Sequence, residues 1–386
     1  MRSWLDDDLA DLLRHGLYRV RRCLQSAQGP HVRLHGRDFV NFSSNDYLNL
    51  AADPRLAAAA SRAARRYGCG AGASPLVSGL LPPLRALERD LAAWEGTEAA
   101  LVFSSGFLAN VALVSTLAGR DDAVFSDALN HASLIDGCRL SHARVHVFRH
   151  ADADHLADLL QREGPTARRR LIVTDSVFSM DGDFAPLADL LELAERFDCL
   201  VLLDEAHATG VLGDQGRGLT DLLPPGSYPS DRVVKMGTLS KALASQGGFV
   251  CGSRRLIAWL VNHARPYIFS TALAPPTAAA ARRAIRIVKT EPERRRTLLG
   301  LAERLRGRLR EMGKQLGASA CQIIPVIVGD SRAAVALSRR LEEQGVLVPA
   351  IRPPSVPEGT ARLRISLTAG HTVEDVDRLA EALRRE

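Results

Sequence analysis

The chain has 386 residues, of which 46% are apolar and 24% are charged, as in globular proteins with one large domain and a smaller one. No apolar run approaches the ~18 residues that cross a bilayer, and the acidic, polar N-terminus does not resemble a secretory signal. The six cysteines are scattered without a CxxC pair, which argues against a disulfide framework or a zinc site. We therefore expect a cytoplasmic protein that has no membrane partner and binds no metal.

The net charge of +6 comes from basic residues dispersed among acidic and apolar ones, and only 5% of the residues are aromatic. A nucleic-acid interface usually needs a clustered basic stripe, often with stacking aromatics. We expect no nucleic-acid partner. The excess charge instead predicts solvated helix faces that mildly favour anionic ligands such as phosphates, carboxylates or coenzyme A.

An N-terminal arm is predicted over residues 1–50, with an amphipathic helix at 4–23 and short strands around HVRLHGRDFVNF. Residues 51–285 then alternate short apolar strands with amphipathic helices, for example at 186–197, where Pro186 suits a first helical turn. This alternation predicts a large α/β domain with a mostly parallel sheet covered by helices on both faces. The seven expected strands are 99–103, 123–126, 144–148, 170–175, 199–204, 232–237 and 248–252.

A small α+β domain is predicted over residues 286–386, after a long helical stretch that begins near residue 275. Thr372 and Asp375 form a start similar to a capping box for its last helix. The expected order is a strand at 323–328, a helix at 331–344, strands at 346–351 and 361–367, and a helix at 372–384.

Covalent amine chemistry depends on few residues here, because only four of the 50 basic residues are lysines. Lys241 follows the apolar run 233–236 and precedes a Ser/Gly-rich turn, where α/β sheets expose catalytic groups. Another apolar run ends in Asp204, and His207 comes three residues later. A lysine to form an imine, a carboxylate for a pyridine nitrogen and an imidazole for the phenolic oxygen are what pyridoxal 5′-phosphate (PLP) needs. Alone, Lys241 would more often be a surface residue.

Further motifs follow strand ends. In SSGFLAN (104–110) a helix begins, and the free N–H groups of Gly106 and Phe107 would bind a phosphate. In NHASLIDG (130–137), His131 could stack on a flat cofactor or move protons. The alternatives are a plain strand–helix turn and an ordinary helix-start histidine. The segment TDSVFSMDGDFAPL (174–187) should place Asp175 and Ser179 at the same sheet edge.

The glycine-rich segment at 68–79 reads GxGxG rather than the GxGxxG of NAD-binding proteins, and no clear apolar strand precedes it. A loop that lines the active site is the better interpretation. On the predicted strand 361–367, Arg362 and Arg364 share one face by alternation. One of them is expected to bind a substrate carboxylate, unless both are exposed sheet residues.

Together these segments resemble the α-oxoamine synthases, PLP-dependent enzymes of fold type I that condense an amino acid with an acyl-CoA and release CO2. The resemblance covers nearly the whole chain and includes NFSSNDYLNL (41–50), SVFSMDGD, LLDEAHATGVLGDQGRG, TLSKALASQGG and YIFSTALAP. The C-terminal AIRPPSVPEGTARLRISLTAGH is most similar to the member that joins L-alanine to a pimeloyl thioester in biotin biosynthesis. The resemblance therefore implies a PLP-dependent acyltransferase that forms a homodimer.

The resemblance also implies roles for residues that would hold the cofactor. Lys241 would form the imine and later move protons, Asp204 would pair with the pyridine nitrogen, and His131 would stack on the ring. The remaining contacts would be Ser179 and His207 at the phenolic oxygen, and Gly106, Phe107 and Thr238 on the phosphate side. Asp175 stands where a longer Glu is expected in the family, so its contact should differ.

The substrate residues are likewise implied by the resemblance alone. Asn45 and Arg364 are candidates for the amino acid carboxylate, and Arg21, Arg352 and Ser355 for the acyl substrate. The donor stays open between pimeloyl-CoA and a pimeloyl acyl carrier protein. Rival activities within the family are those of glycine C-acetyltransferase, 5-aminolevulinate synthase and serine palmitoyltransferase. From other classes, the rivals are an NAD(P)-dependent dehydrogenase and a catalytically silent PLP-fold scaffold.

Overall fold

The computed structural model describes residues 2–224, 226 and 230–386. The chain folds into two compact units, and each is made of segments that are distant in the sequence. Unit 1 contains the chain up to Asn49, Ser179–Asp183 and Arg296–Glu386, whereas unit 2 contains Leu50–Phe178 and Phe184–Arg295.

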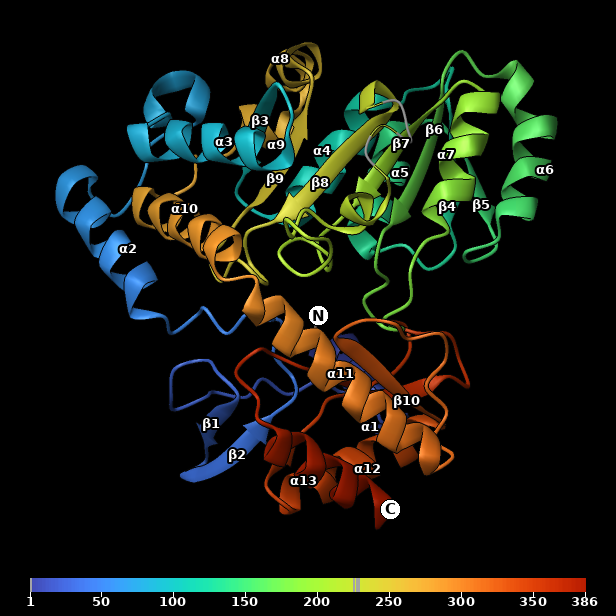
Figure 1. Cartoon of the computed structure of the whole chain (residues 1–386). Helices are drawn as coiled ribbons and strands as arrows, with labels where there is room; N and C mark the ends of the chain where they lie inside the picture. Colours follow the sequence, from blue (N-terminus) through green and yellow to red (C-terminus); the bar gives the residue numbers. More distant parts are fainter. Residues whose placement is uncertain (1, 225, 227–229) are drawn as a thin grey trace. The chain divides into compact units, whose positions relative to one another are not determined.

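Unit 2 is built on the seven-stranded sheet that the sequence predicts (Figure 1). The strand order is β3-β9-β8-β7-β6-β4-β5, and β9 runs in the direction opposite to the other six strands. The expectation of a mostly parallel sheet is therefore confirmed. The strands are β3 (Ala99–Phe103), β4 (Ala123–Asp127), β5 (Arg144–Phe148), β6 (Arg170–Asp175), β7 (Cys199–Asp204), β8 (Val233–Thr238) and β9 (Gly248–Gly252).

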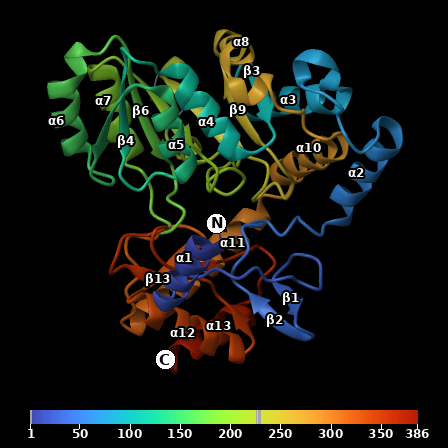
Figure 2. The ribbon, with the colours of Figure 1, turned by 180° about the vertical axis from the view of Figure 1, so that it is seen from behind.

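Helices cover both faces of this sheet. Figure 2 shows α4 and α5 on one face, where Leu113 and Leu134 join the buried core with Val173 and Leu202 of the strands. The opposite face carries α6 and α7 (Figure 1). The helices of unit 2 are α2 (Pro54–Tyr67), α3 (Pro82–Glu95), α4 (Gly106–Leu117), α5 (Ala132–Ser141), α6 (Ala153–Glu163), α7 (Leu187–Arg196), α8 (Arg254–His263), α9 (Arg265–Ile268) and α10 (Pro275–Thr290). Short helical turns lie at Pro75–Gly79, Gly164–Thr166, Leu219–Leu222 and Ser230–Arg232.

Unit 1 holds two small three-stranded sheets and four helices. The sheet orders are β1-β2-β11 and β10-β13-β12. The strands are β1 (His31–Leu34), β2 (Arg37–Asn41), β10 (Ile323–Gly329), β11 (Val346–Leu347), β12 (Ala350–Ile351) and β13 (Ala361–Ser366). The helices are α1 (Arg2–Arg14), α11 (Glu293–Glu311, which begins in unit 2), α12 (Ser331–Glu343) and α13 (Val373–Arg384). Helix α13 begins with the capping box expected at Thr372 and Asp375.

Three expectations about single elements were wrong. The first helix ends at Arg14 rather than near residue 23, because Gly16 adopts a left-handed conformation (φ 66°). The strand expected at 346–351 is split into β11 and β12, which join different sheets. Pro349 lies between them and has no N–H group to continue a strand ladder. Pro186 caps α7 instead of lying inside its first turn.

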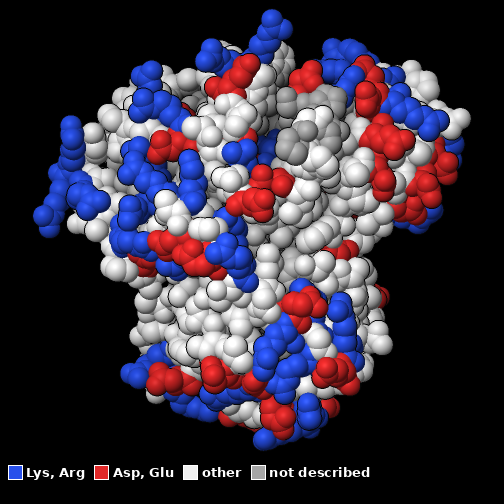
Figure 3. All heavy atoms as spheres, viewed as in Figure 1, with Lys and Arg blue, Asp and Glu red and all other residues white. Residues whose placement is uncertain are grey.

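Charged side chains of both signs are mixed over the face drawn in Figure 3. One ion pair between such groups is Arg282–Asp90, at 2.7 Å between Nε and Oδ2. In the described part of the chain, no helix combines the length and the apolar character needed to cross a membrane.

Candidate active site

The carboxyl ends of the parallel strands of unit 2 bring several polar side chains to one edge of the sheet. Asp175 and Asp204 are the last residues of β6 and β7 and are direct neighbours in the parallel register. Thr238 ends β8, the next strand. The apolar residues before them fill the covered interior of the sheet, so each polar group emerges where its strand leaves the core.

Lys241 lies three residues after β8, in the loop that leads to β9. Its Nζ lies 2.8 Å from Nε2 of His207, which follows β7. The lysine is partly buried and the histidine is buried. The lysine that the sequence predicts to form the imine is thus in direct contact with the histidine predicted for the phenolic oxygen.

Asp204 has a buried carboxylate, 3% exposed, and both of its oxygens are fixed by donors. Oδ1 accepts from the backbone N–H of Ala206 at 2.8 Å, and Oδ2 accepts from Nδ2 of Asn110 at 2.6 Å. A buried anion held in this way is suited to a cationic partner such as a protonated pyridine nitrogen.

His131 caps the N-terminus of α5 at the same edge. Its backbone N–H donates to Oδ2 of Asp175 at 2.7 Å, and its ring lies edge-on to Phe107 with 6.3 Å between ring centroids. Burial lowers the pKa of the His131 imidazole, Asp204 opposes this shift, and Lys241 adds to it. This shift favours the uncharged form of the ring.

Asp175 stands where a longer glutamate is expected, and the structure gives it a definite contact. Its carboxylate is buried and accepts the N–H of His131, while its own N–H donates to Oδ1 of Asn130 at 3.0 Å. Burial, together with the negative charge of Asp204, raises the pKa of Asp175 well above its usual value. Asp175 thus fixes the start of α5, on which His131 lies.

The start of α4 forms a cradle that fits a phosphate group. Gly106 and Phe107 are its first two residues, whose N–H groups have no partner within a helix. The Ser105 side chain takes the N–H of Leu108 at 3.1 Å and leaves those two groups available. A Cβ atom at position 106 would lie 3.3 Å from Oγ1 of Thr238, so a side chain there would fill the cradle.

This donor set fits PLP in three respects. It offers a phosphate cradle at α4, a buried carboxylate at Asp204 and a lysine amine at Lys241, all from unit 2. The glycine-rich segment at 68–79 follows helix α2 instead of a strand, so it lacks the setting of a dinucleotide fingerprint.

Unit 1 contains the expected substrate residues. Arg364 on β13 is 6% exposed and donates to Oδ1 of Asn45 at 3.2 Å, to Oγ of Ser366 at 2.7 Å and to the carbonyl oxygen of Ser179. Ser179 also lies in unit 1, whereas the other residues expected to bind the cofactor lie in unit 2. The structure brings Asn45, Ser179 and Arg364 together.

The other arginine of this strand has a different environment. Arg362 is 4% exposed and forms an ion pair with Asp181, so the alternative that both arginines are exposed sheet residues was wrong. Because Asp181 already neutralises Arg362, Arg364 is the better candidate for a substrate carboxylate.

The residues expected at the acyl substrate are only partly together. Arg352 donates to the carbonyl oxygen of Gly16, and its own carbonyl accepts the N–H of Ser355 at 3.1 Å. Burial lowers the pKa of Arg352, as do the charges of Arg19 and Arg339. Arg21 is exposed on the segment that follows α1.

Asn110 and Ser133 are polar residues of this edge to which the sequence gave no role. They lie inside helices, on α4 and α5, and are 1% and 0% exposed. In the sequence, the one indication of a role for them is that they lie within the motifs SSGFLAN and NHASLIDG. A motif does not show which residue a buried polar side chain contacts.

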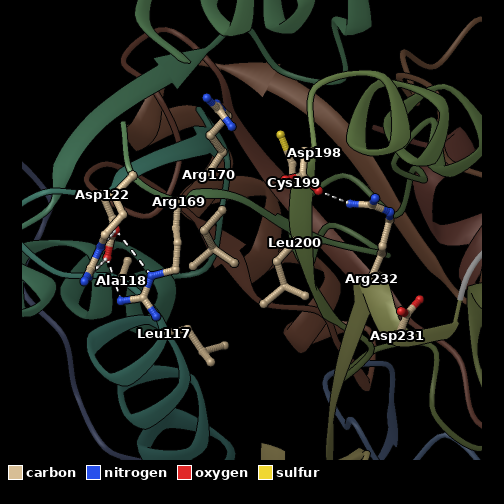
Figure 4. A pocket seen from close by; sticks show the side chains of 12 residues that line it. Leu117, Ala118, Asp122, Arg169, Arg170, Asp198, Cys199, Leu200, Asp231 and Arg232 are labelled. Atoms are coloured by element: carbon tan, nitrogen blue, oxygen red, sulfur yellow. Dashed lines mark hydrogen bonds and ion pairs between the residues drawn. The ribbon is translucent and has the colours of Figure 1, made fainter. Parts of the chain in front are cut away.

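A separate hollow of about 390 Å³ lies at the opposite, amino-terminal edge of the same sheet (Figure 4). Three of its lining arginines are paired with acids: Arg168 and Arg169 with the buried Asp122 at 3.1 and 2.9 Å, and Arg232 with Asp198 at 2.8 Å. Burial acts to raise the pKa of Asp122, but hydrogen bonds from Arg168 and Arg169 outweigh it and lower that pKa to about 2. This hollow does not include the residues of the candidate active site.

The chain belongs to the aminotransferase class I and II family, whose model matches residues 37–383. It is 51% identical over 382 residues to an 8-amino-7-oxononanoate synthase from Anaeromyxobacter dehalogenans, which covers 99% of this chain and 94% of the relative. The family and the site together establish a PLP-dependent enzyme, as the sequence predicted.

Two solved structures support the same family. Serine palmitoyltransferase from S. paucimobilis, with a bound PLP–myriocin aldimine, superposes with a TM-score of 0.93 at 31% identity and covers 99% of this chain and 96% of that one. An 8-amino-7-oxononanoate synthase from Francisella tularensis superposes with a TM-score of 0.77 at 27% identity and covers 90% of this chain and 97% of that one.

Proposed function

We propose that this chain catalyses the decarboxylative condensation of L-alanine with a pimeloyl thioester in biotin biosynthesis. The products are 8-amino-7-oxononanoate, CO2 and the free thiol of the acyl carrier. The observation that carries the proposal is the contact between Lys241 and His207 beside the buried Asp204. It occurs in a chain that is 51% identical to a relative named for this product.

The cofactor residues divide into three contacts. PLP, when bound, supplies a ring that accepts electrons from the carbon atom next to the substrate amine. Gly106, Phe107 and Thr238 would hold its phosphate, and Asp204 would hold the proton on its ring nitrogen. Ser179 and His207 are proposed for its phenolic oxygen.

Lys241 is the proposed base that removes the α-proton of L-alanine and later returns a proton to the product. A partly buried amine whose Nζ lies 2.8 Å from an imidazole nitrogen can accept and release a proton without leaving the site. His131 would cover the cofactor ring and donate a hydrogen bond to the thioester oxygen, where negative charge develops when the new carbon–carbon bond forms.

Arg364 and Asn45 are proposed to bind the carboxylate of L-alanine. The guanidinium of Arg364 is buried and positioned by Ser366 and the carbonyl oxygen of Ser179, so little side-chain freedom is lost on binding. Arg21, Arg352 and Ser355 are proposed for the acyl substrate, whose distal carboxylate suits a cationic site.

The oligomeric state, the acyl donor and the cellular location belong to the same proposal. We infer a homodimer from the resemblance to the family, in which subunits share the active site. A pimeloyl carrier protein is retained as an alternative donor to pimeloyl-CoA. A cytoplasmic location is supported by the six cysteines, all of them free thiols and four of them buried.

The proposal is tested by measuring thiol release from PLP-loaded protein. L-alanine, glycine and L-serine are each combined with pimeloyl-CoA, acetyl-CoA and palmitoyl-CoA, and product is identified by mass. Turnover restricted to L-alanine with pimeloyl-CoA is the expected result. Turnover only with glycine and acetyl-CoA would transfer the chain to another member of the family.

Serine palmitoyltransferase activity is the second candidate, because that enzyme gives the higher TM-score, 0.93 against 0.77. Sequence identity favours the first candidate, at 51% over 99% of the chain against 31%. The arms with L-serine and palmitoyl-CoA decide between them.

A further inference from the structure

Two buried side chains connect Asp204 to His131 through consecutive hydrogen bonds within unit 2. Nδ2 of Asn110 lies 2.6 Å from Oδ2 of Asp204 and 2.9 Å from Oγ of Ser133. Oγ of Ser133 lies 2.7 Å from Nδ1 of His131. Asn110 and Ser133 are 1% and 0% exposed, so the middle of this chain of hydrogen bonds is shielded from water, whereas His131 at its end is an exposed residue.

The direction of each hydrogen bond follows from simple donor and acceptor chemistry. A carboxylate only accepts, so the amide nitrogen of Asn110 must face Asp204. The same nitrogen donates to the Ser133 hydroxyl oxygen, which leaves the hydroxyl proton of Ser133 for Nδ1 of His131. The backbone N–H of Ser133 also points at Nδ1, at 3.3 Å. Nδ1 is therefore an acceptor.

The protonation of the His131 ring is then determined. Because Nδ1 accepts two hydrogen bonds, the single ring proton of the neutral imidazole lies on Nε2. A ring in this form donates at Nε2 and cannot act there as a base. This separates the role of His131 from that of Lys241, which has the free amine needed to take a proton.

We propose that Asn110 and Ser133 are positioning residues that hold His131 as a neutral imidazole with its proton on Nε2, ready to donate to the reacting oxygen of the acyl donor. This role rests on the proposed acyl transfer. Asn110 serves two purposes, since one amide nitrogen orients the carboxylate of Asp204 and supports Ser133. A change at either residue should reach the chemistry through His131.

A purely structural role for Ser133 would have different consequences. Loss of a buried hydrogen bond would lower stability but leave the ring tautomer unchanged. Ser141 offers a matched control, because it is a buried serine on the same helix whose Oγ donates to the carbonyl oxygen of Cys138 at 2.7 Å. The Ser141→Ala variant should lose a comparable hydrogen bond without affecting His131.

The first test reads the ring nitrogens directly by NMR of PLP-loaded protein labelled with ¹⁵N-histidine, without substrate. The His131 signals are assigned among the 11 histidines by comparison with His131→Gln. We expect an unprotonated Nδ1 and a protonated Nε2 at neutral pH, and a shift toward a tautomer mixture in Ser133→Ala but not in Ser141→Ala. A protonated Nδ1 in the unmodified protein would overturn the proposal, whichever acyl donor the enzyme uses.

The second test asks whether Ser133 acts through His131. His131→Gln should lower kcat by about 10²- to 10³-fold, the usual loss for one donor to a developing oxyanion. Ser133→Ala should lower kcat by a smaller factor, with KM for the amino acid and the cofactor absorbance unchanged. Adding Ser133→Ala to His131→Gln should cause no further loss, whereas losses that multiply would show that Ser133 acts independently and would contradict the proposal.

Discussion

Nζ of Lys241 lies 2.8 Å from Nε2 of His207, although 34 positions separate these residues in the sequence. The contact exists because β7 and β8 are neighbouring parallel strands, so the loops that follow their carboxyl ends meet at one edge of the sheet. An ammonium group only donates hydrogen bonds, so Nε2 of His207 accepts when Lys241 is charged. This relationship holds the amine in place at the candidate active site.

Replacing Lys241 by alanine should remove turnover almost completely. In the proposed mechanism the amine both binds the cofactor covalently and moves the substrate proton, so we expect a loss of at least about 10²- to 10⁴-fold in kcat. Lys289→Ala, at an exposed position on α10, is the control that should keep full activity. Thiol release measures both variants, and unchanged turnover in Lys241→Ala would be incompatible with the proposed role.

Replacing Gly106 by alanine should weaken cofactor binding. The new methyl group would lie 3.3 Å from Oγ1 of Thr238 and fill the phosphate cradle. Overpacking of this kind costs about 1–3 kcal/mol, so we expect the Kd for PLP to rise by roughly tenfold or more. Gly300→Ala, where the added Cβ meets nothing within 4 Å, is the control. Titration of protein freed of cofactor would contradict the prediction if both variants bound PLP equally well.

Replacing Arg364 by glutamine should impair binding of the amino acid more than the chemical step. A hydrogen bond to a charged group contributes about 1.5–3 kcal/mol, so KM for L-alanine should rise by roughly 10- to 100-fold. Steady-state kinetics at varied L-alanine and saturating acyl donor measure this effect. A change confined to kcat would argue that Arg364 does not bind the carboxylate.

His371 in unit 1 should make folding stability depend on pH. Burial lowers the pKa of His371 to about 4, against opposing effects of Asp375 and of backbone hydrogen bonds with Thr368 and Asn41. As the pH falls through about 6.5, the His371 side chain of the unfolded chain therefore binds a proton, whereas in the folded protein it stays unprotonated until near pH 4. Stability is retained above this pH and falls as the pH drops toward 4, by about 1.4 kcal/mol per pH unit from this residue.

Thermal unfolding at pH 7 and pH 5 checks this expectation. The melting temperature should fall between the two values, and the fall should be smaller in His371→Gln, which cannot titrate. His15→Gln, at an exposed position on the segment after α1, is the control. The same pH dependence in all three proteins would show that His371 is not responsible.

The sequence predicted the sheet of unit 2 well because its strands are short apolar runs between amphipathic helices. β3 and β6 have the bounds predicted from the sequence, 99–103 and 170–175. The sequence predicted the element bounds less well in unit 1, where single glycine and proline residues determine where elements end. Gly16 ends the first helix through a left-handed conformation, and Pro349 divides a single apolar run between two sheets. Hydrophobic periodicity alone predicts neither the end of this helix nor the division of this strand.

The candidate site shows a similar division. Lys241, Asp204, His207 and His131 could be expected at one edge because they follow strand ends, and the structure places them there, while their roles stay predictions. Asn110 and Ser133 could not be recognised, because they lie inside helices and their partners come from other elements. Which of Arg362 and Arg364 has an acidic partner also became evident only from the ion pair of Arg362 with Asp181.

The measurement that most directly tests the account identifies the lysine that carries the cofactor. Borohydride reduction of PLP-loaded protein fixes the cofactor to its lysine, and peptide mass spectrometry then locates the added mass among the four lysines of the chain. The account predicts one pyridoxyl group per chain, on Lys241. Label on Lys235, Lys289 or Lys314, or no covalent label at all, would contradict it.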